Sequence, residues 1–195
     1  LYYIPAGQYG KEGVLALLEQ HPEIKFVSLV GIDLAGNDTD EKIPMSAFFD
    51  DYESFFEGRA VQTDGSSVVL TNIATLNNAR VDMWGDPSVN WFVDYNYENI
   101  DPVTGLPTGT LRIPAFLMHN YRYVDSRSIL KRSCDYVRAE LLALIKEYGL
   151  PGMPHVKADE VVDIIFTSAT ELEFWVKTPS RTVTKKELSV SQKLQ

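Results

Sequence analysis

Two glutamates near the C-terminal end of the chain have the spacing of a paired carboxylate site. Residues 171–176 read Glu-Leu-Glu-Phe-Trp-Val, so Glu171 and Glu173 alternate with apolar residues. Side chains alternate between the two faces of a β-strand, which would place both carboxylates on one face, about 7 Å apart. Such carboxylates repel each other unless solvent or cations lie between them, and oxygen ligands of this kind suit Mg²⁺ or Mn²⁺. The pattern is typical either of a divalent-cation site or, more simply, of an amphipathic strand with one solvated face.

A second candidate is the tetrapeptide Asp64-Gly65-Ser66-Ser67. Its residue types are typical of a turn between strands. An aspartate in such a turn can bind a small cation or accept a proton, and the hydroxyl of Ser67 can add a hydrogen bond. The segment does not have the pattern of a phosphate-binding loop, because no glycine-rich stretch opens a helix there.

Histidine and cysteine chemistry is not expected. His21, His119 and His155 are far apart in the sequence and lack metal-ligand spacing. Cys134 is the only cysteine, which excludes an internal disulfide. It falls on the apolar stripe of a predicted helix, where a thiol is normally an inert core group.

Charge and hydropathy exclude further classes of protein. The net charge is −9, with 18 Lys and Arg against 27 Asp and Glu, so phosphate backbones and anionic bilayers would repel the chain. The sequence contains neither a run of 18 apolar residues nor the pattern of a signal peptide at its start. We therefore expect a cytoplasmic protein that binds neither nucleic acid nor a membrane.

Hydrophobic patterning predicts an α+β fold. Strands are predicted over residues 24–33, 68–70, 81–84, 91–97, 110–118, 161–166 and 170–176, with a return strand starting at 42–44. Helices are predicted over 10–20, from a cap at Ser46 to Gly58, and over 126–148, with Asp125 or Ser126 as the cap of the last. This last helix carries an apolar stripe that we expect to face a core, formed by Leu130, Cys134, Val137, Leu141, Leu144 and Tyr148.

Taken in order, these segments resemble the N-terminal part of a glutamine synthetase of a divergent bacterial type. Each motif alone is common, but six of them in this order over residues 26–176 are specific. The last two are Asp125-Ser126-Arg127-Ser128-Ile129-Leu130-Lys131-Arg132, similar to the family's Asp-Pro-Arg-x-x-Leu-Lys-Arg, and the Glu-x-Glu-Phe at 171–174. The earlier ones are the strands at 26–33 and 42–44, Gly58 followed by the Asp64 tetrapeptide, Asp82-Met83 with Asp86-Pro87, and Asp94.

The resemblance implies a division into domains and roles for four residues. Residues 1–23 would form an N-terminal helical arm, 24–122 a β-grasp-like domain, and 123–195 the beginning of a catalytic domain with an antiparallel sheet and helices. Glu171 and Glu173 would each ligate one of two Mg²⁺ or Mn²⁺ ions beside ATP and glutamate. Asp64, with Ser67 beside it, would form the ammonium site and take the proton.

The implied reaction is the ATP-dependent formation of glutamine from glutamate and ammonia through γ-glutamyl phosphate. Metal ions neutralise charge during phosphoryl transfer, and ammonium becomes nucleophilic only after it loses a proton. In this family the enzyme is a homo-oligomeric ring, and the Asp64 loop completes the neighbouring subunit's site. A ligase that uses another amine, or a noncatalytic ring-forming relative, is the alternative.

The chain also departs from the family's pattern. Ser126 stands where the family has proline, and the aromatic residue that many members carry after the Asp64 turn is absent. The nucleotide-binding and glutamate-binding residues of the family are expected beyond Gln195, so this segment would be an incomplete enzyme.

Overall fold

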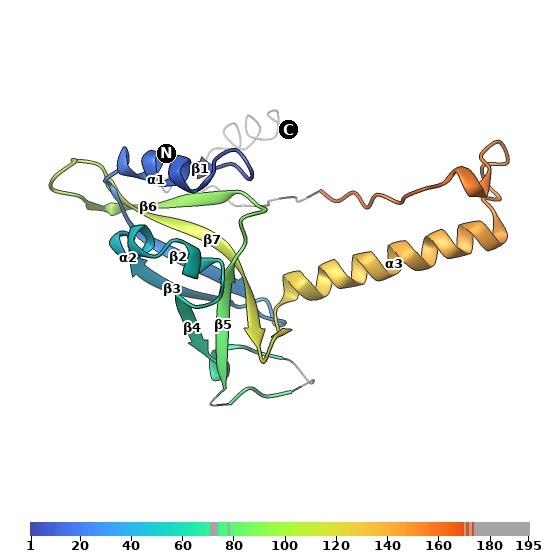
Figure 1. Ribbon diagram of the computed structural model, residues 1–195, viewed down its shortest axis with the longest axis horizontal. Coiled ribbons are helices and arrows are strands. Elements are labelled where there is room, and N and C mark those ends of the chain that lie inside the picture. Colours follow the sequence, from blue (N-terminus) through green and yellow to red (C-terminus); the bar gives the residue numbers. More distant parts are fainter. Residues whose placement is uncertain (71–73, 78, 170, 172, 174–195) are drawn as a thin grey trace, which may run out of the picture.

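The sheet is organised around two adjacent parallel strands. The computed structural model (Figure 1) describes residues 1–70, 74–77, 79–169, 171 and 173. β2 (Ile24–Ile32) and β7 (Pro107–His119) run parallel, and the other strand pairs of the described residues are antiparallel. The remaining strands are β1 (Tyr3–Ile4), β3 (Asp38–Pro44), β4 (Val61–Asp64), β5 (Arg80–Gly85), β6 (Trp91–Ile100) and β8 (Arg122–Tyr123). Their order is β1-β6-β7-β2-β3, while β5 pairs with both β4 and β7, and β8 pairs with β7.

The long strand β7 joins two parts of this sheet. Its residues 109–114 pair with β2 and its residues 107–112 with β6. Beyond Pro114 it pairs with β5 and then with β8. The β7–β8 turn is a two-residue hairpin in which Asn120 and Tyr121 have positive φ angles of 47° and 61°, as a type I′ turn requires. The β4–β5 pair, which ends at Asp64, is thereby fixed to the C-terminal half of β7.

Helical segments pack against the sheet around one hydrophobic core (Figure 1). They are α1 (Lys11–Glu19), α2 (Met45–Asp50) and the 3-10 turn η1 (Glu53–Phe55). The core is built from alternate residues of the central strands and from the apolar faces of these segments, because each element can remove only one face from water. It includes Val27, Leu29, Leu111 and Ile113 of the strands and Val14, Leu18, Phe48 and Phe55 of the helical segments. The predicted α+β class is confirmed, and residues 1–23 contribute to the same core.

The helix predicted from Ser46 to Gly58 is wrong in its extent and its cap. The residue before α2 is Pro44, no side chain caps the helix, and the backbone leaves the helical region at Asp51, where φ is −141° and ψ is 62°. The chain folds back here because Phe48 packs edge-on against Phe55, with ring centroids 5.0 Å apart, and a continuous helix would not bring these rings together in this way. Gly58 has the predicted left-handed conformation, with φ +67°.

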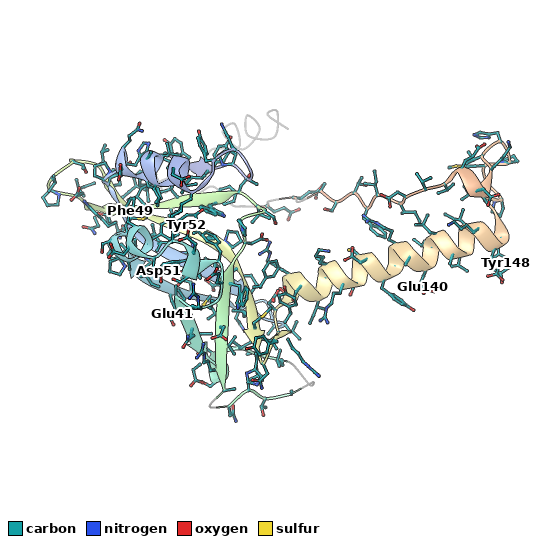
Figure 2. The ribbon with its side chains drawn as sticks, in the orientation of Figure 1. Glu41, Phe49, Asp51, Tyr52, Glu140 and Tyr148 are labelled. Atoms are coloured by element: carbon teal, nitrogen blue, oxygen red, sulfur yellow. The ribbon has the colours of Figure 1, made fainter. Side chains whose placement is uncertain are left out.

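The helix predicted at 126–148 is confirmed as α3 (Ser126–Tyr148), but its predicted burial is wrong. Figures 1 and 2 show α3 projecting from the sheet, with Glu140 and Tyr148 far from it. The apolar stripe is largely exposed: Leu130 is 65% exposed and Tyr148 69%. Cys134 is half-buried rather than a core residue. Helix bounds follow from local capping, whereas burial of a stripe needs a partner surface, and the described residues do not supply one here.

Some predicted strands are also corrected. Residues 68–70, which follow the 3-10 turn η2 (Gly65–Ser67), contain only an isolated bridge between Leu70 and Ala74, because the N–H of Val69 donates to the side chain of Asp33 and not to a neighbouring strand. Residues 161–166, after the 3-10 turn η3 (Ala158–Glu160), form no strand and pair with none of the described strands. The predicted strand at 170–176 lies largely outside the described residues. The return strand predicted to start at 42–44 instead ends at Pro44, because β3 begins at Asp38, directly after the turn that follows β2. The short strands β1, β4 and β8 lie outside the predicted strands.

Within the described ranges, no helix combines the length and the apolar character needed to cross a bilayer.

Candidate functional site

The turn after β4 presents the carboxylate of Asp64 to solvent. Asp64 caps η2, and its Oδ1 accepts a hydrogen bond from the backbone N–H of Ser66 at 2.7 Å. Hydrogen bonding by Ser66, from both its side chain and its backbone, lowers the pKa of the Asp64 carboxyl. The group is therefore ionised at neutral pH. It forms no ion pair with any residue in the described part of the chain.

Gly65 gives this turn its shape. It is buried, and its N–H donates to the carbonyl oxygen of Ala79 at 2.7 Å. A Cβ atom at this position would lie 2.0 Å from the carbonyl oxygen of Leu76, which is backbone and cannot rotate away. Any other residue would push Leu76 away from the turn, so the glycine next to Asp64 is required by close packing rather than by its φ angle.

The β2–β3 hairpin holds the far end of the turn through Asp33. This carboxylate is fully buried and accepts four hydrogen bonds of 2.9–3.0 Å, from the N–H groups of Ala35 and Asn37, the side-chain amide of Asn37, and the N–H of Val69. Burial alone would raise the pKa of Asp33, but these bonds outweigh it and lower the pKa.

Two further bonds connect the same hairpin to the turn. The N–H of Leu34 donates to the carbonyl of Val69 at 3.2 Å, and the hydroxyl of Thr39 donates to the carbonyl of Ser67 at 3.3 Å. Ser67 itself is exposed. The turn that carries both predicted residues, Asp64 and Ser67, is thus held by a buried aspartate 31 residues earlier in the chain, which no motif in the sequence marks as part of the site.

A hollow of about 410 Å³ opens on the outer side of β5 and the β7–β8 hairpin. Its lining combines charged and aromatic side chains: Arg80, Asp82, Trp84, Met118, His119, Asn120 and Tyr121. Arg80 is the cross-strand partner of Asp64 in the β4–β5 ladder. Asp64 therefore lies at the strand end next to this hollow, and both are on the part of the sheet that β7 anchors.

The two C-terminal glutamates are not part of the turn or of the hollow. Glu171 and Glu173 are both exposed and lie in no helix or strand. Neither forms an ion pair with a described residue. No group of three or more His, Cys, Asp or Glu side chains that could hold a metal ion occurs among the residues that the structure describes. Their role as metal ligands, like that of Asp64 and Ser67 as an ammonium site, stays a prediction.

The motif at 125–128 anchors α3 to the sheet. Asp125 is fully buried; its carboxylate accepts from the N–H of Ser128 at 2.7 Å and from the N–H of Leu117 in β7 at 3.1 Å. The hydroxyl of Ser126 donates to the carbonyl of Ile32 at 3.2 Å, which adds a hydrogen bond between the start of α3 and the end of β2.

Arg127 completes this anchor by pairing with Asp86 at 2.6 Å and lying over the ring of Phe116, 4.8 Å from its centroid. Asp86 is buried, which would raise its pKa, but Ser88 and Arg127 outweigh burial and lower the pKa of its carboxyl. Two motifs that are 41 residues apart in sequence thus form one structural contact. It fixes where α3 leaves the sheet.

The described residues form an α+β domain with a mixed sheet, and both its sequence and its structure can be compared with those of known proteins. The sequence matches no protein-family model and no curated protein. The structure is similar to a Plasmodium falciparum glutamine synthetase solved by cryo-electron microscopy, at 15% identity and a TM-score of 0.47, over 70% of this chain and 24% of that one. It is also similar to a GmaS chain in a complex with ADP, at 15% identity and a TM-score of 0.37, over 64% of this chain and 26% of that one. The chain therefore spans about a quarter of the length of each. The first of them bears the name of the family that the sequence motifs resemble.

Proposed function

We propose that this chain is part of an ATP-dependent ligase that forms glutamine from glutamate and ammonia through a γ-glutamyl phosphate. The ordered motifs over residues 26–176 support the proposal. The observation that carries it is the Asp64 carboxylate: ionised, exposed, held in a fixed turn, and without an ion-pair partner among the described residues.

Asp64 has the properties that an ammonium site needs. Ammonium is a small cation, so an unpaired carboxylate at the surface attracts it. Ammonia attacks an acyl phosphate only after ammonium has lost a proton, and the second oxygen of Asp64 can accept that proton. The exposed hydroxyl of Ser67, the residue that follows Ser66, can orient the nitrogen. The rigid turn keeps both groups in position, which matters because misplacement of a catalytic group is costly in rate.

Glu171 and Glu173 are the residues that would contribute to Mg²⁺ or Mn²⁺ binding. Carboxylate oxygens are the donors that these ions take, and Mg²⁺ commonly uses one or two carboxylates together with water and substrate phosphates. Glu171 and Glu173 are exposed and supply carboxylate oxygens, the kind of ligand that these ions bind. When bound, the ions would neutralise charge as the γ-phosphoryl group moves from ATP to glutamate.

The proposal includes a homo-oligomeric ring in the cytoplasm. The Asp64 turn lies at the outer end of β4, on the surface, where it can reach the site of a neighbouring copy. Cross-linking or analytical ultracentrifugation of the full protein tests the assembly.

The decisive experiment replaces Asp64 with alanine in the full protein and measures amide formation against ammonium concentration. Removal of a general base predicts a loss of about 10²-fold in kcat/KM for ammonium, with a much smaller effect on the KM for ATP. Asp38→Asn, which alters an exposed carboxylate on β3, is the matched control and should leave both constants unchanged. Unchanged turnover of Asp64→Ala at low ammonium would contradict the role.

Two companion measurements address the alternatives. Comparing ammonium with methylamine and a polyamine as acceptors distinguishes glutamine formation from a γ-glutamyl ligase that uses another amine. Calorimetric titration with Mn²⁺ in the presence of ATP distinguishes a ligase from a noncatalytic relative. A ligase should show heat of binding that the Glu171→Ala, Glu173→Ala variant lacks.

A further inference from the structure

We propose that Asp82 is a positioning residue that holds the Arg80 guanidinium away from Asp64 and so keeps the Asp64 carboxylate available to a cation. This inference rests on the proposed function, since it concerns the same ammonium site. It adds Arg80 and Asp82 of β5 to that site and explains why Asp64, although opposite an arginine, forms no ion pair with any described residue.

The strand register puts the three residues on one face. Asp64 faces Arg80 directly across the β4–β5 ladder, and Asp82 lies two residues further along β5. Residues i and i+2 of a strand share a face. The alternating burial agrees: Thr63 and Val81 point to the buried side, whereas Asp64 and Arg80 are exposed and Asp82 is half-buried.

Arg80 has two carboxylates within reach but pairs with only one. Its Nε lies 2.6 Å from Oδ1 of Asp82. Directly opposed residues of an antiparallel pair have Cβ atoms about 4.5–5.5 Å apart, so a rotation of the arginine side chain would bring its guanidinium to Asp64. The guanidinium is the best bidentate partner of a carboxylate, and it would occupy the oxygens that ammonium needs.

The surroundings favour the pair with Asp82. Asp82 is 30% exposed and Arg80 63% exposed, and both line the hollow next to the Asp64 turn. An ion pair that is partly shielded from water is screened less than one at a fully exposed carboxylate such as Asp64. Asp64 also has one oxygen occupied by the N–H of Ser66.

The test is a double-mutant cycle in the full protein, with Asp82→Asn, Arg80→Gln and the double variant. Asp82→Asn should raise the KM for ammonium about two- to fivefold, the range expected from gaining one exposed ion pair. Adding Arg80→Gln to Asp82→Asn should return this KM to within about twofold of the wild type, and Arg80→Gln alone should not raise it. Asp135→Asn removes a comparable exposed pair, Lys131–Asp135 at 2.8 Å on α3, and should change nothing.

A second readout does not depend on catalysis. In Asp82→Asn the carboxyl carbon resonance of Asp64, assigned with Asp64→Asn, should titrate at lower pH than in the wild type, and the double variant should reverse this change. Unchanged titration of Asp64 in Asp82→Asn, or a raised KM that Arg80→Gln does not relieve, would overturn the inference. If Asp64→Ala leaves turnover at low ammonium unchanged, the proposed function fails, but the titration still decides whether Asp82 governs the Arg80–Asp64 contact.

Discussion

Replacing Asp33 with asparagine tests whether the β2–β3 hairpin holds the Asp64 turn. The substitution keeps the size of the side chain but leaves one acceptor oxygen where the wild type has two. An amide nitrogen then faces either the N–H groups of Ala35 and Asn37 or that of Val69. Because Asp33 is fully buried, water cannot replace the lost acceptor.

The expected cost follows from the bonds that are lost. A hydrogen bond to a charged group contributes about 1.5–3 kcal/mol, and a buried donor left without an acceptor costs about as much as its desolvation. Asn37 can turn its side-chain amide and recover one bond, so we expect a loss of about 2–3 kcal/mol in the free energy of unfolding. For a chain of this length that lowers Tm by roughly 5–10 °C.

Urea unfolding measures this loss, and its pH dependence adds a second check. Hydrogen bonding lowers the pKa of Asp33 in the folded protein. The stabilisation from its ionised form is therefore present above its ordinary pKa and disappears as the pH falls through its folded-state value. The difference between wild type and Asp33→Asn should be largest near neutral pH and should shrink in acid.

Hydrogen exchange separates a local effect on the turn from general destabilisation. The amide of Val69 should lose protection in Asp33→Asn beyond what the global loss explains. Asp101→Asn is the matched control, because Asp101 is also a buried carboxylate, 6% exposed, that accepts hydrogen bonds in a different turn, from Thr104. It should destabilise the protein and leave Val69 protected relative to the rest. Equal protection of Val69 in both variants would refute the reasoning.

Three further predictions concern other parts of the fold. Gly65→Ala should cost at least about 2 kcal/mol in the free energy of unfolding, because its Cβ would lie 2.0 Å from the Leu76 carbonyl oxygen, and denaturant unfolding measures it. Arg127→Met should destabilise by about 3 kcal/mol by leaving the buried Asp86 carboxylate unpaired, and the combined Arg127→Met, Asp86→Ser variant should be more stable than Arg127→Met alone. Hydrogen bonds outweigh burial and lower the pKa of Glu23. The stabilisation of the fold by ionised Glu23 is therefore present above its ordinary pKa and is lost as the pH falls through its folded-state pKa. Glu23→Gln should flatten the dependence of Tm on pH in the acidic range.

Local signals in the sequence were sufficient for several elements. The bounds of α3 follow from the cap at Asp125 and from Gly149, which has φ +73°, and both act within one helical turn. The strand β2 and the turn at Asp64 were predicted for the same reason, since alternation and turn residue types depend only on neighbours in sequence. The continuous helix over Phe48 and Phe55 was not found, because contacts between rings decided where the chain folds back.

The surroundings of the candidate site could not be predicted in the same way. The Asp64 tetrapeptide stands out by its composition, but nothing local to it indicates that Asp33 binds Val69 or that Arg80 lies opposite Asp64. Those contacts depend on the register of strands that are distant in sequence. The Arg80–Asp82 salt bridge is local to β5, but its place opposite Asp64 is set only once β4 and β5 have paired.

What the sequence by itself determined is a set of local units: the helix at 126–148, the strand β2 and the turn at Asp64. Only the tertiary structure decided that β2 and β7 lie parallel at the centre and that the apolar stripe of α3 is exposed. It also decided that the buried Asp33 holds the turn after Asp64 and that the Arg80–Asp82 ion pair lies opposite Asp64. The physical reason is the sequence separation over which each kind of interaction acts. Caps, turns and side-chain alternation act between residues a few positions apart, whereas burial and ion pairing depend on which distant surfaces the packed sheet brings together.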